Sequence, residues 1–191
     1  MNHRERESQS NDQQARSSTR PSGLIIVILG APGTGKTTTL RALSARLGCP
    51  KFELSWMPEF SMRDGERIAY EEDEAIAVDA LVQVAKTYVR HGHRHVLLSD
   101  FRLATLARVR ELLTDVPHLF VVLHSSDEAA LTSRVLDESR SSGYRDTAEA
   151  VALNAQYPHL GLPGSLLVDT GGASVEEVVE IIVKHLQAYP N

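Results

Sequence analysis

An uninterrupted apolar run directly before a glycine-rich segment constrains the fold of this chain more than any other feature. Residues 24–29 are all Leu, Ile or Val, and the run stops at Gly30. Such a run without polar alternation is typical of a strand buried on both faces of a parallel sheet. The following segment fits the pattern G-x-x-x-x-G-K-[ST] at every position: Gly30, Ala31, Pro32, Gly33, Thr34, Gly35, Lys36 and Thr37. The sequence therefore predicts a strand, a phosphate-binding turn and a helix in direct succession.

The residue types of this segment suit a nucleotide triphosphate. Glycines let the backbone turn sharply, so that successive N–H groups point at one phosphate, and a helix predicted from Gly35 adds its positive end. Lys36 is expected to reach the β- and γ-phosphates, and the Thr37 hydroxyl to ligate Mg²⁺, with Thr38 as a further phosphate contact. A dinucleotide-binding turn is disfavoured, because Thr38 stands where that fingerprint needs a third small residue. We therefore expect ATP and Mg²⁺ as cofactors.

Strand and helix patterns alternate along the rest of the chain. Apolar runs predict further strands at 51–54, 95–99, 119–124 and 166–168. Helical patterns follow at 35–47, 69–91, 102–114, from about 127, at 147–156 and at 174–188. Two capping boxes are expected, one at Ser125 with Glu128 and one at Ser174 with Glu177. The alternation implies right-handed crossovers, and hence an α/β fold of three layers: the P-loop NTPase fold, with a five-stranded parallel sheet and helices on both faces.

Composition divides the chain into two parts. Residues 1–22 contain no Val, Ile, Leu, Phe, Tyr or Trp, so we expect a disordered polar tail followed by one domain at 23–191. The tail has no apolar segment typical of a secretory signal, and no run approaches the length of a membrane span. The formal net charge of −5 argues against a nucleic-acid or membrane-surface partner. We therefore expect a cytoplasmic protein, while the sequence leaves the oligomeric state open.

The strand predicted at 95–99 ends directly before Asp100. In a doubly wound sheet the strand ends line the ligand crevice, so Asp100 is expected to face the phosphates. It could hold Mg²⁺ through water or accept a proton from an attacking hydroxyl. The alternative is a helix N-cap. The next residue is Phe101 and not the Glu that polarises water in many ATPases, which favours transfer to a substrate over hydrolysis.

Three short stretches resemble the adenylate-kinase-like nucleoside monophosphate kinases. Asp100-Phe101-Arg102 is similar to a shortened Asp-Gly-Phe-Pro-Arg segment of that family. Residues 131–134 resemble the turn at which its lid helix begins, and residues 141–146 resemble the short lid of its compact members. The overall resemblance covers roughly residues 24–188, and shikimate- and gluconate-type kinases share the same phosphate-donor half. It implies a P-loop kinase-like domain with a lid at about 134–147.

The resemblance also implies roles for four arginines. Arg134 would pack beside the adenine, Arg140 and Arg145 would close over the transferring phosphoryl group, and Arg102 would hold an anionic acceptor. Guanidinium groups suit the charge that spreads over a phosphoryl group in transfer. The chain departs from the family after the lid, where Asn154 stands in place of an arginine.

Candidates for the acceptor site lie between residues 52 and 67. The segment lacks the Ser/Thr-Gly-Asp pattern with which the family binds a monophosphate, so AMP is not supported as the acceptor. Glu53 could bind a hydroxyl or an amine, and Arg63 a phosphate or a carboxylate. Trp56 and Phe60 could stack on a flat group such as a base, or they could close a small core under the loop.

These features together predict a small-molecule kinase. It would bind Mg·ATP at residues 30–38 and transfer the γ-phosphoryl group to a small acceptor, anionic or bearing a base, with a nucleotide or nucleoside as the candidate. Lys36, Asp100, Arg140 and Arg145 would be its catalytic residues, and Thr37 and Asp100 its metal ligands. Two alternatives remain at this point: a nucleotide-binding regulatory protein with slow ATPase activity, and a P-loop toxin or resistance-type kinase.

Overall fold

The protein, described by a computed structural model, has the architecture that the sequence predicts. The structure describes residues 23–57, 62–63, 65–139 and 142–188. The predicted tail at 1–22, the stacking candidate Phe60 and the lid residue Arg140 lie outside the described residues.

Five parallel strands form the central sheet in the order β2-β5-β1-β6-β7. The strands are β1 (Leu24–Gly30), β2 (Lys51–Glu53), β5 (His95–Ser99), β6 (His118–His124) and β7 (Leu166–Asp169). In the register of the sheet, Ser99 pairs with both Ile28 of β1 and Glu53 of β2. The predicted three-layer α/β fold is confirmed, and the strand order brings the ends of β2, β5 and β1 side by side.

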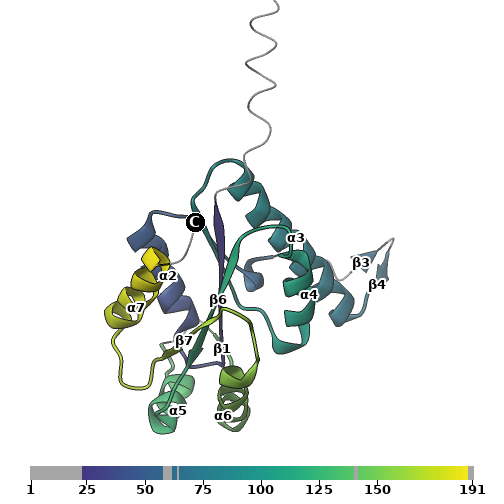
Figure 1. The fold of residues 1–191 in the computed structure, drawn as a ribbon. Helices are drawn as coiled ribbons and strands as arrows, with labels where there is room; N and C mark the ends of the chain where they lie inside the picture. The colour runs from purple at the N-terminus through teal and green to yellow at the C-terminus, as the bar shows by residue number, and fades with distance from the viewer. Residues whose placement is uncertain (1–22, 58–61, 64, 140–141, 189–191) are drawn as a thin grey trace, which may run out of the picture.

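Helices cover both faces of the sheet, as Figure 1 shows. Helices α2 (Lys36–Leu47) and α7 (Val175–Ala188) pack on one face, and α3 (Tyr70–Arg90) and α4 (Leu106–Leu112) on the other. Helices α5 (Glu128–Leu136) and α6 (Thr147–Gln156) pack together at the end of the sheet where β1 ends.

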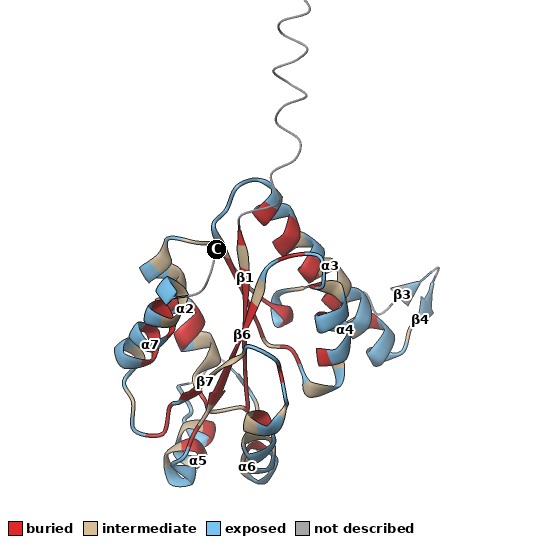
Figure 2. Ribbon diagram, viewed as in Figure 1, coloured by how far each residue is buried: buried red, intermediate tan, exposed pale blue. Residues whose placement is uncertain are grey.

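The apolar run of β1 supplies both cores. Ile25, Val27 and Leu29 belong to the core under α3 and α4, whereas Ile26 and Ile28 belong to the core under α2 and α7. Alternate side chains of a strand point to opposite faces, so a strand at the centre of three layers must be apolar at every position. Figure 2 shows β1 and β6 as largely buried.

Local differences from the prediction have physical causes. The capping box expected at Ser125 and Glu128 is wrong, because Asp127 caps α5: its Oδ1 accepts a hydrogen bond from the Ala130 N–H at 2.9 Å. Ser125 instead donates to the Asp127 carbonyl at 2.8 Å. The box formed by Ser174 and Glu177 is confirmed, with hydrogen bonds of 2.8 and 3.2 Å.

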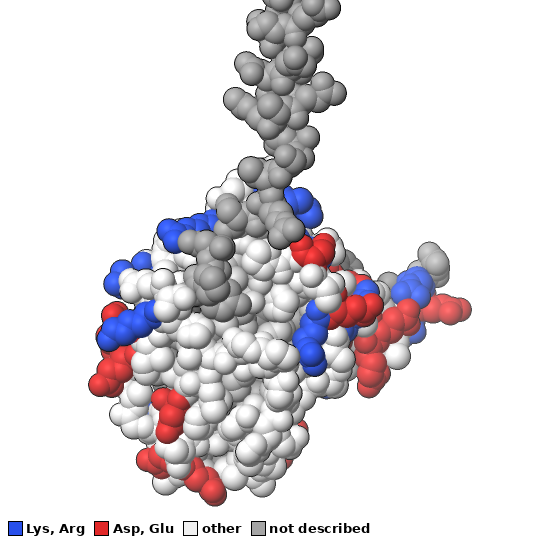
Figure 3. All heavy atoms as spheres, in the orientation of Figure 1, with Lys and Arg blue, Asp and Glu red and all other residues white. Residues whose placement is uncertain are grey.

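The segment between β2 and α3 contains structure that the sequence pattern does not reveal. The strand predicted to reach residue 54 ends at Glu53 and is followed by a 3₁₀ turn, Leu54–Trp56. A small antiparallel hairpin follows, formed by β3 (Met62–Arg63) and β4 (Glu66–Arg67). The hairpin projects beside α3, in a region where charged side chains of both signs gather (Figures 1 and 3).

The predicted helix at 102–114 is also divided, into a 3₁₀ turn at Leu103–Thr105 and α4. Among the described residues, no helix combines the length and the apolar character that a membrane crossing needs.

Candidate functional site

The turn between β1 and α2 has a backbone that only glycine can adopt without strain. Gly30 and Gly33 have φ angles of 153° and 87°. A Cβ on Gly30 would lie 2.5 Å from Thr34 Oγ1, and one on Gly33 would lie 2.9 Å from a methyl group of Val135. Real Cβ atoms do not approach other heavy atoms this closely, so both glycines are required by the close packing of the turn.

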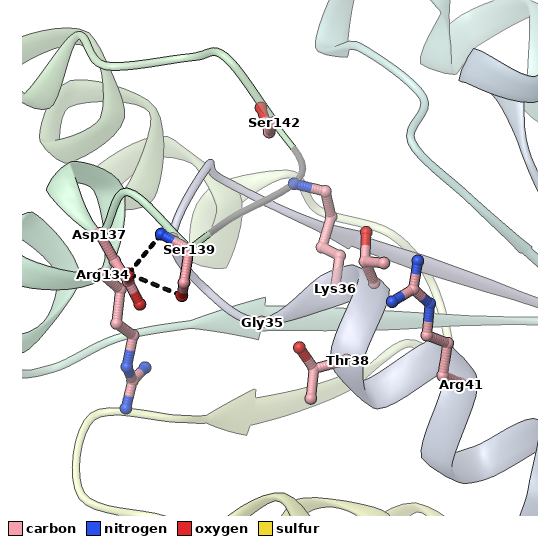
Figure 4. A pocket seen from close by; sticks show the side chains of 10 residues that line it. Gly35, Lys36, Thr38, Arg41, Arg134, Asp137, Ser139 and Ser142 are labelled. Atoms are coloured by element: carbon pink, nitrogen blue, oxygen red, sulfur yellow. Dashed lines mark hydrogen bonds between the residues drawn. The ribbon is translucent and has the colours of Figure 1, made fainter.

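A cavity of about 430 Å³ opens over this turn. Its lining comes from two sides (Figure 4): α2 contributes Lys36, Thr37, Thr38 and Arg41, while α5 and the segment after it contribute Arg134, Asp137, Ser139 and Ser142. The Lys36 ammonium group donates to the Ala31 carbonyl at 3.2 Å and so lies over the turn. The cavity has the size of a small-ligand site, and the start of α2 with its Lys36 suits a phosphate group.

Thr37 contacts a buried carboxylate at the end of β2. Its hydroxyl donates to Glu53 Oε2 at 2.7 Å, and Glu53 is only 5% exposed. A hydroxyl that donates its proton to a carboxylate keeps its lone pairs available for a cation. Hydroxyl and carboxylate oxygens are donors that suit Mg²⁺.

The described residues contain no cluster of three or more His, Cys, Asp or Glu side chains able to hold a metal ion. A cation beside Thr37 would therefore take its remaining ligands from phosphate oxygens and water, as Mg²⁺ commonly does in nucleotide sites. The residues present thus fit a magnesium–nucleotide complex. Glu53, which the sequence predicts to bind the acceptor, lies beside Thr37, the predicted metal ligand.

The cavity over the glycine-rich turn is called the phosphate cavity below. Arg134 lies between it and a smaller neighbouring cavity of about 170 Å³. Its guanidinium group donates to the Thr170 carbonyl at 3.0 Å. The smaller cavity is lined in part by Ala173, Val175 and Val178. A guanidinium plane beside apolar side chains is an environment in which a flat base can stack.

The turn that holds Thr170 is fixed by Asp169. Asp169 Oδ1 accepts hydrogen bonds from the N–H groups of Ser126 and Gly171, at 2.9 and 2.8 Å. Burial alone would raise the pKa of this carboxyl, but the hydrogen bonds from Ser126 and Gly171 outweigh it and lower the pKa to about 2. The charged carboxylate therefore ties the turn after β7 to the turn after β6.

Asp100 lies directly after β5 and lines a different cavity, of about 340 Å³. Its φ angle of 76° is in the left-handed region, which a residue with a side chain rarely adopts. The 3₁₀ turn that follows begins after Arg102, so Asp100 does not cap a helix. Its carboxylate lies close enough to Tyr157 to help burial raise the pKa of that phenol to about 12. Asp100 therefore lies at the same edge of the sheet as the glycine-rich turn, but its side chain lines the neighbouring cavity.

The structure separates the other predicted acceptor residues. Arg102 lines the Asp100 cavity, whereas Trp56 and Arg63 are not among the described residues that line it. Trp56 is 52% exposed, with the Lys51 ammonium group 5.7 Å from its ring centre. Arg63, on the β3–β4 hairpin, forms an ion pair with Glu72 at 2.6 Å.

Arg145 and Asn154 make local contacts in the segment that carries the predicted lid. Arg145 donates to the carbonyls of Ser142 and Tyr144, at 2.6 and 2.8 Å, and is not among the described residues lining the phosphate cavity. Asn154, where the family resemblance would place an arginine, donates to the Ser125 carbonyl and accepts from the Ser125 N–H, both at 2.8 Å. Asn154 thus fastens α6 to the end of β6.

Several cavity residues were not found by sequence reasoning. Arg41 follows Thr37 by one helical turn, so the helical period could have placed both on one face. Tyr70, Asp73 and Glu74 line the Asp100 cavity from the start of α3. No local pattern marks them, because only the packing of α3 beside β5 brings them to Asp100.

A glycine-rich turn between β1 and α2, in a parallel sheet where β5 lies between β1 and β2, gives this chain the P-loop fold. A sequence family described as an AAA domain matches residues 25–64, which contain this turn. No curated protein matches the chain.

Solved structures, two of them kinases, share the fold over most of the chain. A gluconokinase from Sinorhizobium meliloti has a TM-score of 0.61 at 21% identity, covering 89% of this chain and 94% of that chain. A sugar kinase from Janibacter has a TM-score of 0.61 at 19% identity, covering 88% and 96% respectively. The YorR protein of Bacillus subtilis, solved with phosphorylated GDP, has a TM-score of 0.56 at 16% identity, covering 87% and 99%. The chain therefore has the P-loop fold that small-molecule kinases use.

Proposed function

We propose that the protein transfers the γ-phosphoryl group of Mg·ATP to a hydroxyl group of a small-molecule acceptor. The observation that carries this proposal is the pairing of two cavities at one edge of the sheet. One lies over the glycine-rich turn that follows β1, and the other contains Asp100 at the end of β5. Kinases with this fold are a further support.

The donor half of the proposed site is the phosphate cavity. Backbone N–H groups of residues 30–38 and the Lys36 ammonium group would bind the phosphates, and the Thr37 hydroxyl would hold Mg²⁺. Arg134 would stack on the adenine from its position between the two donor-side cavities. When bound, Mg·ATP supplies the phosphoryl group, and the cation offsets part of its charge.

Asp100 is the proposed general base. Among the described residues, none donates a hydrogen bond to its carboxylate or forms an ion pair with it, so the carboxylate is available to an acceptor hydroxyl in the cavity. Asp100 would take the hydroxyl proton as the hydroxyl oxygen bonds to the γ-phosphorus. The bond from that phosphorus to the bridging oxygen breaks, and ADP leaves with the electron pair.

The segment at about 134–147 is the proposed lid of a single domain at 23–191. Ser139 and Ser142 already line the phosphate cavity. Closure of this segment would exclude water and bring Arg145 over the phosphoryl group, after it exchanges its carbonyl partners for phosphate oxygens. Arg140 is assigned the same role from the sequence resemblance.

The test is ADP formation from Mg·ATP with and without a panel of small hydroxyl compounds. We expect one class of acceptor to raise the rate well above the acceptor-free background. Lys36→Ala should abolish the stimulated rate, whereas Arg46→Ala, at the far end of α2 and outside the cavity, should retain it. A rate that no acceptor changes would instead indicate a nucleotide-binding protein with slow ATPase activity.

A further inference from the structure

Helix α2 places a second cation, Arg41, in the lining of the phosphate cavity. Arg41 follows Thr37 by four residues and Thr38 by three, the two spacings at which side chains of a helix lie on one face. Side chains of a helix also lean towards its N-terminus, over the preceding turn. Figure 4 shows the Arg41 side chain in this orientation, with its guanidinium group pointing towards the start of α2 and Lys36.

The guanidinium group of Arg41 is available to a ligand. Helix α2 contains no Asp or Glu, so no carboxylate of the helix can pair with it. Within the part of the chain that the structure describes, Arg41 forms no ion pair and donates no hydrogen bond. By contrast Arg102, Arg134 and Arg145, which the sequence predicts to bind ligands, all donate to acceptors of the protein itself.

Arg41 also changes the balance of charge around the phosphate cavity. Among the described lining residues, Lys36, Arg41 and Arg134 are cationic and Asp137 is anionic. A second carboxylate, that of Glu53, contacts Thr37 next to this lining. Without Arg41 the cations and carboxylates would balance, so the excess of positive charge that attracts a phosphate chain depends on this residue.

The position of Arg41 points to the terminal phosphate of a bound nucleotide. Arg134 lines both the phosphate cavity and the smaller cavity beside it, whereas Arg41 is not among the described residues that line the smaller one. Figure 4 shows Arg41 and Arg134 on opposite sides of Lys36 and Thr38. A nucleotide with its base beside Arg134 and its phosphates over the glycine-rich turn would therefore extend its terminal phosphate towards Arg41.

We propose that Arg41 binds the terminal phosphate of the nucleotide and makes the site prefer a triphosphate to a diphosphate. This inference rests on the donor half of the proposed function. A guanidinium group can donate two parallel hydrogen bonds to two oxygens of one phosphate, which the ammonium group of Lys36 does not do. ADP lacks the phosphate that Arg41 would bind, so the diphosphate left after transfer would bind less tightly than the triphosphate.

The first experiment measures binding of a non-hydrolysable ATP analogue and of ADP by calorimetry, both in excess Mg²⁺. We expect Arg41→Gln to weaken binding of the analogue about tenfold and binding of ADP less than about threefold, because only the analogue loses a charged hydrogen-bond partner. The matched control is Arg46→Gln, which removes the same charge from the same helix outside the phosphate cavity and should bind like the parent. A loss for ADP as large as that for the analogue, or unchanged binding of the analogue, would overturn the inference.

The second experiment tests whether charge is the cause. Arg41 and Arg46 are both exposed, and Gln has a helix propensity close to that of Arg, so both variants should keep the melting temperature of the parent. Salt screens exposed charges. Added salt should therefore lower the preference for the analogue over ADP in the parent and in Arg46→Gln, and lower it less in Arg41→Gln. An equal fall of this preference in the parent and in Arg41→Gln would refute the role of the Arg41 charge.

The two proposals fail in different ways. A preference for the triphosphate that depends on Arg41, with no acceptor that stimulates ADP formation, would disprove the kinase function and leave the role of Arg41 standing. Acceptor-stimulated ADP formation, together with unchanged binding of the analogue in Arg41→Gln, would support the kinase function and overturn this inference.

Discussion

The contact between Thr37 and Glu53 gives the sharpest test of the donor site. Glu53→Gln retains the size and shape of the side chain, and its amide oxygen can still accept the hydrogen bond from Thr37 that now measures 2.7 Å. The substitution removes only the negative charge. Because Glu53 is 5% exposed, that charge is poorly screened by water.

The expected loss can be worked from this geometry. A hydrogen bond to a charged group contributes about 1.5–3 kcal/mol and one between neutral groups about 0.5–1.5 kcal/mol. Removing the charge therefore weakens the hydrogen bond between Thr37 and residue 53 by ~1–2 kcal/mol. The same loss of free energy in the binding of a cation to the Thr37 hydroxyl corresponds to about tenfold weaker Mg²⁺ affinity. Changes of about 10- to 100-fold are typical when a partner of a metal ligand is altered.

The assay is calorimetric titration of Mg²⁺ into the protein saturated with a non-hydrolysable ATP analogue. We expect the Mg²⁺ dissociation constant to rise about tenfold, while binding of the analogue in excess chelator stays unchanged or tightens, because a carboxylate near its phosphates has been neutralised. Glu180→Gln, an exposed carboxylate of α7, serves as the matched control. An unchanged Mg²⁺ affinity in Glu53→Gln would refute the idea that the Glu53 carboxylate supports Mg²⁺ binding through Thr37.

Three further predictions test separate parts of the structure. Asp100→Asn should lower kcat about 100-fold or more and leave ATP affinity nearly intact, since Asp100 lies outside the phosphate cavity; an unaltered kcat would remove it from the chemistry. Gly33→Ala should abolish binding of the ATP analogue and lower the melting temperature, because its φ of 87° costs another residue about 1–3 kcal/mol and its Cβ would meet Val135; a variant that melts and binds like the parent would contradict the strain argument. The lowered pKa of Asp169 contributes stability that is complete above its ordinary pKa of 3.8 and is lost as pH falls towards 2. Asp169→Asn should therefore melt below the parent at pH 7, with the difference narrowing between pH 4 and 2; a difference independent of pH would show that the charge is not responsible.

The local patterns that predicted correctly are those whose physical cause lies within a few residues. The capping box of Ser174 and Glu177 is confirmed because both partners lie in one helical turn. The box at Ser125 failed because α5 begins two residues later, with Asp127 as its N-cap accepting from the Ala130 N–H, and the Ser125 hydroxyl donates to the Asp127 carbonyl. The role of Asn154 could not be predicted for the same reason, since its partner Ser125 lies far away in the sequence, in the turn after β6.

The sequence by itself determined the strand and the glycine-rich turn on which the proposed donor site is built. The apolar run predicted a strand between two helical layers, and the glycine-rich segment after it predicted a turn that suits a phosphate, because both patterns reside in consecutive residues. The lining of the cavity that contains Asp100 was decided by tertiary structure. Packing of α3 beside β5 set Asp73 and Glu74 in the same cavity as Asp100, and Glu74 pairs there with Arg102. Glu53 likewise reached Thr37 only because β2 ends beside α2. Charge in a cavity is a sum over side chains distant in sequence, so its sign emerges only when the fold has brought them together.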